Sequence, residues 1–239
     1  MIRTAWDDRT LVVTMDRPER RNAVNAEALE GLLFAQHEAA SARAVILTGS
    51  GGSFCSGADL SALEDTGFAG LLSRVLTGFG HLGVPVIAAV QGPALGAGTQ
   101  LAAACDLRVS TPDAVFGIPA AKLGLAIDWW TVERLRDQLG GSVARGMLVA
   151  AQTYRGAQLL ASGFVHRLGT LDDALLWARE LTTLAPLTMA AHKRGLEALG
   201  DRPVDPAFAA LRERCWDSAD AVEGRQAFLD KRTPDFRGV

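Results

Sequence analysis

The chain has 239 residues, of which 49% are hydrophobic and 21% charged, and its net charge is −3. This composition is typical of a globular chain that can bury a large core, in one large domain or two small ones. The charge gives no reason to expect a nucleic-acid partner, and no apolar stretch approaches the roughly 20 residues of a membrane span. The N-terminal ten residues lack a basic start followed by an apolar run, so we expect no signal peptide. Three cysteines cannot all pair and lack metal-ligand spacing, which favours a reducing, cytoplasmic location and no metal site.

The first half of the chain is predicted to alternate strands and helices. Residues 10–16 are expected to form a strand in a hairpin with residues 1–6. Asn25 is the expected N-cap of a helix that carries leucines at helical spacing. Unbroken apolar runs are typical of buried strands. Such strands are predicted at 44–49 and 85–90. A third strand is predicted at 106–110, and a helix near 67–82.

The second half is predicted to be mostly helical from about residue 130. Residues 171–184 repeat apolar side chains at helical spacing, and the C-terminal segment continues in this way. The expected fold class is therefore α/β, with a core over 1–180 and a C-terminal helical region over 181–239 that is not an independent domain.

Two glycine-rich loops each follow a predicted buried strand and precede a predicted helix. They are "GSGGSFCSGADL" (49–60) and "VQGPALGAGTQL" (90–101). A turn at a helix start presents free N–H groups to a carbonyl oxygen or an oxyanion. Taken alone, each loop is an ordinary turn. Neither loop has dinucleotide-binding spacing, and Ser56 lacks the motif of a serine nucleophile.

Together and in this order, these loops resemble those of the crotonase (enoyl-CoA hydratase/isomerase) superfamily. "RPERRNAVN", "FCSGADL", "PVIAAVQGPALGAGTQLAAACDLRV", "FGIPAAKLGL" and "FLDKRTPDF" carry the likeness along almost the whole chain. The resemblance implies a spiral of ββα units with a helical C-terminal trimerisation region, and assembly as a homotrimer or a dimer of trimers. It also implies an acyl-CoA thioester as ligand, with coenzyme A as part of that ligand and no separate cofactor.

The resemblance assigns roles to individual residues. The backbone N–H groups of Ala58 and Ala97 are the expected donors to the thioester oxygen, although most relatives have glycine at the second position. The residues expected around coenzyme A are Arg21, Ala23, Ser56, Asp59, Leu60 and Gly96. Phe228 and Lys231 are expected near the adenine of the same or a neighbouring subunit, although Lys231 is equally well explained as a solvated helix charge.

The residues that hydrate the double bond are missing. In hydratases of this family two glutamates activate and deliver water, and the matching positions here are Gln100 and Ala120. Neither side chain can take up or release a proton near neutral pH. Because general acid–base groups each contribute typically ~10²–10⁴ in rate, we expect little or no hydratase activity.

Asp128 is the remaining acid of this region, and two interpretations of it are open. Dienoyl-CoA isomerases and aroyl-CoA dehalogenases carry a catalytic aspartate at a matching place. Alternatively, Asp128 caps the helix that begins at Trp129–Trp130, an ordinary role that we favour. The two tryptophans either line the acyl pocket or belong to the core.

The sequence thus leaves three hypotheses for function. The first is a protein of fatty acid metabolism that binds fatty acyl-CoA with little hydratase activity. The second is an isomerase or dehalogenase-like enzyme that uses Asp128 as acid, base or nucleophile. The third is a structural subunit that has lost CoA binding, which the two intact loops disfavour.

Overall fold

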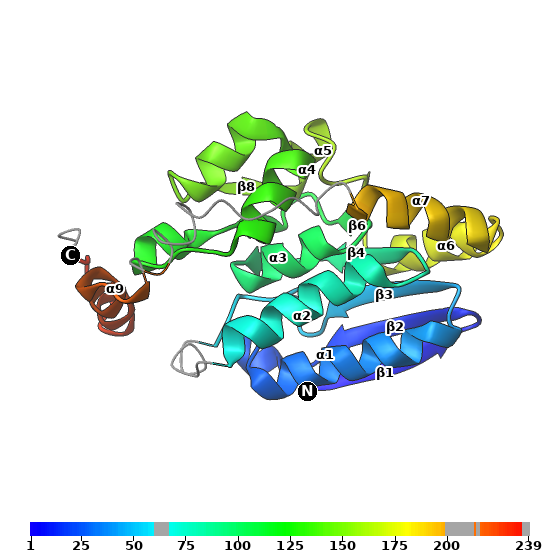
Figure 1. Cartoon of the computed structure of the whole chain (residues 1–239), viewed down its shortest axis with the longest axis horizontal. Helices are drawn as coiled ribbons and strands as arrows, with labels where there is room; N and C mark the ends of the chain where they lie inside the picture. The colour runs from blue at the N-terminus through cyan, green and yellow to red at the C-terminus, as the bar shows by residue number, and fades with distance from the viewer. Residues whose placement is uncertain (60–66, 199–212, 214–215, 236–239) are drawn as a thin grey trace.

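The computed structural model describes residues 1–59, 67–198, 213 and 216–235. A six-stranded sheet runs through the molecule in the order β1-β2-β3-β4-β6-β9 (Figure 1). β1 and β2 are antiparallel, and the other neighbouring pairs are parallel. The strands are β1 (Ile2–Asp7), β2 (Thr10–Met15), β3 (Ala44–Gly49), β4 (Val86–Val90), β6 (Leu107–Ser110) and β9 (Arg167–Leu168).

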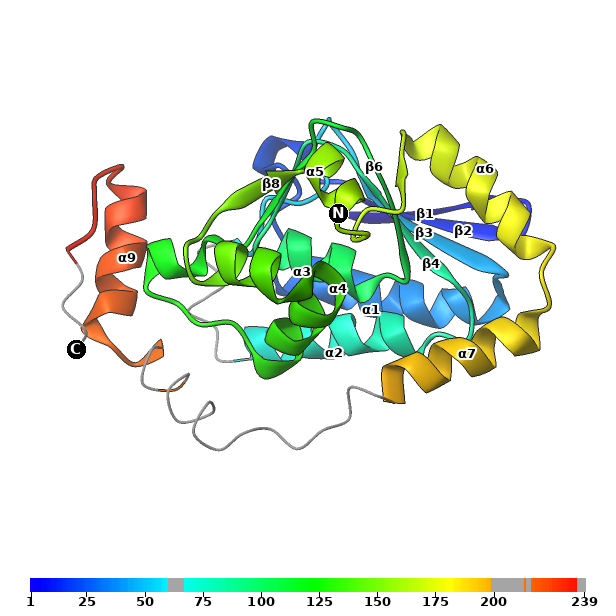
Figure 2. The same ribbon diagram turned by 90° about the horizontal axis from the view of Figure 1, so that it is seen from above.

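Both faces of the central strands are covered, which explains their unbroken apolar runs. In β3, Val45 and Leu47 belong to a large cluster that also holds apolar residues of α1 (Ala26–Glu38) and α2 (Phe68–His81). Ala44 and Ile46 point the other way, toward α6 (Leu171–Thr182). Figure 2 shows α2 and α6 on opposite sides of β3 and β4. Alternation along a strand sends successive side chains to opposite faces, so a strand buried on both sides is apolar at most positions.

A second sheet has three short strands in the order β5-β7-β8. They are β5 (Pro93–Leu95), β7 (Val115–Gly117) and β8 (Thr153–Arg155), with β5 and β7 parallel and β7 and β8 antiparallel. β5 lies inside the second glycine-rich loop, where the sequence predicts no strand. Strands of three residues are too short for hydrophobic alternation to reveal them.

Three helices from the C-terminal part of the chain lie at two ends of the molecule. α6 and α7 (Pro186–Ala198) lie at one end, and α9 (Ala219–Leu229) lies at the other (Figures 1 and 2). α9 packs closely on the 3₁₀ helix η4 (Pro119–Leu123), since a Cβ on Gly224 would stand 2.3 Å from the carbonyl carbon and oxygen of Leu123. The remaining helices are η1 (Pro18–Arg20), η2 (Ala39–Ser41), α3 (Ala97–Ala104), α4 (Trp129–Leu148) and α5 (Gly156–Ala161).

A buried ion pair attaches α7 to the core. The ammonium group of Lys193 lies 2.7 Å from Asp106 Oδ2 and donates to the carbonyl oxygens of Phe79 and Val84, each at 2.9 Å. The same carboxylate oxygen accepts from the Val86 N–H at 2.7 Å. The two charged groups therefore satisfy each other, together with three backbone groups, where α2, β4 and α7 meet.

Several predicted elements are confirmed. The N-terminal hairpin pairs Ile2 with Met15. The Asn25 side chain accepts from the Ala28 N–H at 3.0 Å and caps α1. The α/β class is confirmed, and no helix among the described residues is long and apolar enough to cross a bilayer.

Candidate functional site

A clamp built on Asn22 positions the segment that precedes α1. Arg21 and Asn22 both have left-handed backbone conformations, with φ of 49° and 57°. The buried Asn22 amide donates to the carbonyl oxygens of Ser50 (2.9 Å) and Ser53 (2.7 Å) and accepts from the Arg17 N–H at 2.8 Å. The segment carrying Arg21 is thereby fastened to the first glycine-rich loop.

The first glycine-rich loop presents the N–H of Ala58. Val24 forms a parallel bridge with Ala58, in which the Val24 N–H donates to Gly57 O (2.9 Å) and the Asp59 N–H donates to Val24 O (2.8 Å). Neighbouring backbone groups on an extended chain point in opposite directions, so the N–H of Ala58 points away from Val24. Within the described part of the chain, no acceptor bonds to it.

The second glycine-rich loop presents the N–H of Ala97. Gly96 precedes α3 with φ of 51° and ψ of −118°, a conformation that favours glycine. Ala97 is the first residue of α3, and the first N–H groups of a helix have no intrahelical acceptor. The first backbone hydrogen bond at the start of α3 runs from the Gln100 N–H to Gly96 O at 3.1 Å. Ala97 is 4% exposed, so its N–H is a donor in a largely dry environment that carries the positive end of the helix dipole.

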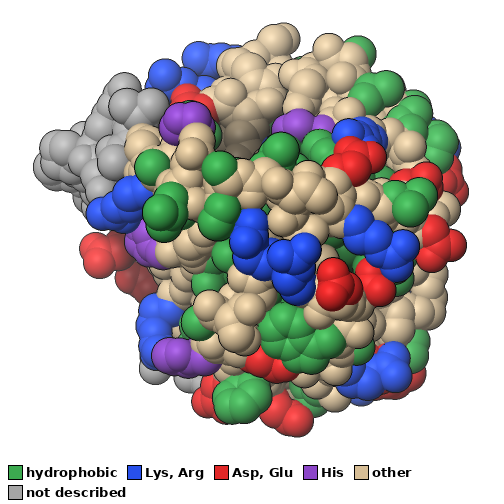
Figure 3. All heavy atoms as spheres, turned by 90° about the vertical axis from the view of Figure 1, so that its right-hand side faces the viewer, with side chains coloured by type: hydrophobic (Ala, Val, Ile, Leu, Met, Phe, Trp, Pro, Cys, Tyr) green, Lys and Arg blue, Asp and Glu red, His purple; other side chains and the backbone are tan. Residues whose placement is uncertain are grey.

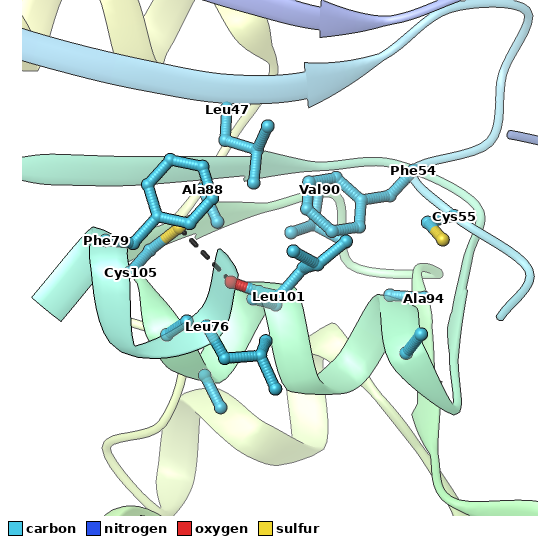
Figure 4. Packing of buried hydrophobic residues seen from close by; sticks show 14 of the residues in the cluster. Leu47, Phe54, Cys55, Leu76, Phe79, Ala88, Val90, Ala94, Leu101 and Cys105 are labelled. Atoms are coloured by element: carbon cyan, nitrogen blue, oxygen red, sulfur yellow. Dashed lines mark hydrogen bonds between the residues drawn. The ribbon is translucent and has the colours of Figure 1, made fainter. Parts of the chain in front are cut away.

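The two loops are joined by their backbones. The backbone N–H of Cys55 donates to Pro93 O at 3.0 Å, and the backbone N–H of Leu95 donates to Cys55 O at 2.9 Å. A Cβ on Gly98 would stand 2.2 Å from the Cys55 carbonyl oxygen, so α3 can approach this closely only with glycine there. Figure 4 shows Cys55, Ala94 and Leu101 in one packed cluster beside the loops. The donors of Ala58 and Ala97 therefore stand on a rigid framework.

Both donors line one cleft of about 890 Å³. Arg17, Arg20 and Arg21 also line it, and Arg17 forms a 2.9 Å ion pair with Asp59. Apolar residues from distant segments complete the wall, including Phe68 and Leu72 of α2 and Trp216. No group of three or more His, Cys, Asp or Glu side chains able to hold a metal occurs in the described ranges.

The cleft gathers most of the predicted site residues. Those that line it are Arg21, Ala23, Ser56, Ala58, Asp59, Gly96, Ala97, Gln100, Ala120, Asp128 and Phe228. Lys231 follows the end of α9 and is not among the lining residues, and Leu60 lies outside the described residues. Their roles toward a ligand stay predictions.

Sequence reasoning missed several residues of this cleft. Arg17, Phe68, Leu72 and Trp216 reach it from three separate segments. Trp216 donates from Nε1 to Ala126 O at 2.7 Å, which fixes the indole against the loop before α4. Arg17 is the first residue of "RPERRNAVN", and that was the available signal, whereas nothing in the sequence links Trp216 to Ala126.

Asp128 both caps α4 and lines the cleft. Its Oδ1 accepts from the Thr131 N–H at 2.9 Å, which confirms the cap. Its Oδ2 accepts from Thr131 Oγ1 at 2.8 Å and from Gln100 Nε2 at 3.2 Å. Gln100 Nε2 also donates to Thr131 Oγ1 at 2.7 Å. The carboxylate thus accepts three hydrogen bonds from the protein itself.

Comparison with known proteins agrees with this geometry. The family model described as enoyl-CoA hydratase/isomerase matches residues 7–239. A protein of Mycobacterium tuberculosis named "Probable enoyl-CoA hydratase echA6" is 41% identical over 245 residues, covering 100% of both chains. The structure of EchA1_1 from Mycobacterium paratuberculosis is 34% identical, with a TM-score of 0.89 over 100% of this chain and 98% of that one.

The fold itself is shared more widely. The structure of methylmalonyl-CoA decarboxylase is 22% identical and covers 100% of this chain and 98% of its own, with a TM-score of 0.92. At that identity the likeness shows the fold alone, and that fold is the crotonase fold expected from the glycine-rich loops. The chain belongs to the enoyl-CoA hydratase/isomerase family.

Proposed function

We propose that this protein binds fatty acyl-CoA thioesters in the cleft and hydrates them little or not at all. The observation that carries the proposal is the composition of the cleft wall. It keeps two backbone donors, from Ala58 and Ala97, but has Gln100 and Ala120 where the resemblance expects the two glutamates. Donors fixed in advance suit a thioester oxygen, while hydration also needs groups that move protons.

The acids that do line the described cleft are already engaged. Asp59 pairs with Arg17 at 2.9 Å. Asp128 accepts hydrogen bonds from Thr131 and Gln100. Glu19 is exposed and lies 3.9 Å from Arg17. This supports binding over acid–base chemistry at the acyl group.

Coenzyme A would lie along the basic side of the cleft. Arg20 and Arg21 offer charges to its phosphates, and Phe228 on α9 offers an aromatic face to adenine. The acyl chain would follow the apolar wall. The proposed acyl-CoA ligand places the protein in fatty acid metabolism, and the three cysteines without a pairing pattern favour the cytoplasm.

A series of saturated acyl-CoA thioesters of increasing chain length tests the binding, by titration calorimetry. Burial contributes about 0.8 kcal/mol per methylene, so affinity should rise about three- to four-fold with each added carbon until the cleft is full. Free coenzyme A serves as the control for the contribution of the nucleotide. Failure of every chain length to bind would refute the proposal.

An enzyme that uses Asp128 is the second candidate, because that carboxylate lines the cleft. Its test is turnover of unsaturated and aromatic acyl-CoA thioesters by wild-type protein and by Asp128→Asn. Loss of a measurable conversion in a variant that still binds acyl-CoA would establish the second candidate and reject the first.

Assembly as a trimer, or as a dimer of trimers, belongs to the same proposal. α7 and the turn before it expose Leu184 (50%), Leu187 (84%) and Leu196 (69%). Figure 3, which faces the side of α6 and α7, shows hydrophobic side chains among charged ones on that side. Light scattering at micromolar concentration should give a multiple of three chains, and a monomer would contradict this.

A further inference from the structure

The side-chain amide of Gln100 has only one possible orientation. One of its terminal atoms lies 2.7 Å from Thr131 Oγ1 and 3.2 Å from Asp128 Oδ2. A carboxylate only accepts hydrogen bonds, and the Thr131 hydroxyl donates its single proton to Asp128 Oδ2 at 2.8 Å. The Gln100 atom that faces both oxygens must therefore be the amino nitrogen Nε2, and both of its protons are used.

The carbonyl oxygen Oε1 of Gln100 is consequently the end that remains available. Nothing in the described part of the chain donates to it. It is also not one of the fully buried side-chain atoms that lack a hydrogen-bond partner, so part of it is accessible. Gln100 is 5% exposed and lines the cleft, so the accessible part of this residue faces the cleft. The cleft wall thus presents one hydrogen-bond acceptor whose direction is set by Asp128.

This acceptor stands close to the thioester donor. Gln100 follows Ala97 by three residues on α3, so the two residues share one face of the helix, one turn apart. Side chains of a helix lean toward its N-terminus, which brings the Gln100 side chain back toward the first turn. A thioester whose oxygen meets the Ala97 N–H therefore carries its second and third carbons past Gln100.

Resting on the proposed acyl-CoA binding, we propose that Gln100 Oε1 selects acyl-CoA thioesters with a hydroxyl group on the second or third carbon. Such a hydroxyl donates to Oε1 when the ligand occupies the cleft. An unsubstituted chain that covers the acceptor leaves it without a donor, which is costly. A keto group at the same carbon brings a second acceptor against the first and gains nothing.

Calorimetry with four thioesters of equal chain length tests this selection in the wild-type protein. They are the unsubstituted, 2-hydroxy, 3-hydroxy and 3-oxo acyl-CoA forms. At least one hydroxy form should bind about ten-fold more tightly than the unsubstituted form, and the 3-oxo form should bind no more tightly than it. Equal affinities for all four would overturn the selection and leave acyl-CoA binding intact. Binding of none would overturn the proposed function instead.

Asp128→Asn gives a sharper test of the selection, because it exchanges donors and acceptors in the hydrogen bonds among Gln100, Thr131 and residue 128. The new side-chain amide can still accept from the Thr131 N–H, but its amino group now donates where Oδ2 accepted. Gln100 would then turn its oxygen inward and present its amino group to the cleft. The hydroxy form should lose its advantage over the 3-oxo form by about ten-fold, and an unchanged ratio would contradict the proposal.

A matched pair of glutamine variants controls for folding. Gln100→Met removes the acceptor with little change in shape and should abolish the preference for the hydroxy form. Gln138→Met makes the same change on α4, where Gln138 donates to Ala103 O at 3.1 Å outside the cleft lining, and should keep the preference. A preference that survives Gln100→Met would refute the selection.

Discussion

Gly98 of α3 lies against the backbone of Cys55, so closely that a Cβ on Gly98 would stand 2.2 Å from the Cys55 carbonyl oxygen. This contact joins the two loops that carry the Ala58 and Ala97 donors. The geometry of the candidate oxyanion site therefore requires glycine, which has no side chain, at position 98.

Gly98→Ala should force the two loops apart. We expect the free energy of unfolding to fall by about 1–3 kcal/mol, as for other overpacked positions, and acyl-CoA binding to weaken. Gly70→Ala in α2 is the matched control, since a Cβ at Gly70 meets nothing within 4 Å and alanine favours the helix. Urea unfolding measures the free energy of unfolding of both variants. Equal stability of the two would show that the contact between Gly98 and Cys55 is not tight.

Ala97→Pro should remove one donor while leaving the helix start intact. Proline is tolerated at the first position of a helix because the missing N–H has no intrahelical acceptor. Binding of a long-chain acyl-CoA should weaken by roughly 0.5–1.5 kcal/mol, about two- to thirteen-fold.

Ala26→Pro controls for the proline itself. Ala26 is the first residue of α1, after the Asn25 cap, and does not line the cleft. This variant should bind acyl-CoA as the wild type does. If a folded Ala97→Pro variant also binds with wild-type affinity, the Ala97 N–H does not hold the thioester.

Asp128→Ala should destabilise the protein more than Asp128→Asn does. Alanine removes the cap on α4 and leaves Gln100 and Thr131 without their shared acceptor, whereas asparagine can still accept from the Thr131 N–H. Thermal or urea unfolding should show a loss of about 0.5–2 kcal/mol for alanine and a smaller loss for asparagine. Two variants of equal stability would mean that the capping bond contributes little.

The thiols of Cys55 and Cys105 should resist alkylation in the folded protein. Both are fully buried, and burial raises the pKa of each thiol from 9.0 to about 12. At pH 8 the thiolate fraction is then about one part in 10⁴, and the sulfur is also inaccessible. Peptide mass spectrometry after iodoacetamide treatment should find both unmodified in native protein and both modified in denaturant. Rapid labelling of either in the native state would contradict the burial.

The sequence predicted the parts of the fold that depend on local pattern. The apolar run 44–49 became β3 because both faces of that strand are covered, and Asn25 caps α1 as its position indicated. The glycine-rich loops were found because close backbone approach demands glycine, as it does at Gly98.

What the sequence could not predict depends on contacts between distant residues. Gln100 and Asp128 are 28 positions apart, so their shared network with Thr131 has no local signature. The sequence leaves Asp128 open as either a cap or a site residue, whereas the structure shows it capping α4 and lining the cleft at once. Trp216 reaches the same cleft through a hydrogen bond to Ala126, 90 positions away.

Hydration of crotonyl-CoA, followed by the loss of its ultraviolet absorbance, tests the central claim most directly. The same preparation should bind a long-chain acyl-CoA by calorimetry, and Ala97→Pro purified in parallel identifies contaminating hydratase, whose activity the substitution would not change. With Gln100 and Ala120 in place of two acids, the rate should fall at least about 10²-fold below that of a family hydratase with both glutamates. A rate within ten-fold of that hydratase, lost in Ala97→Pro, would contradict the account.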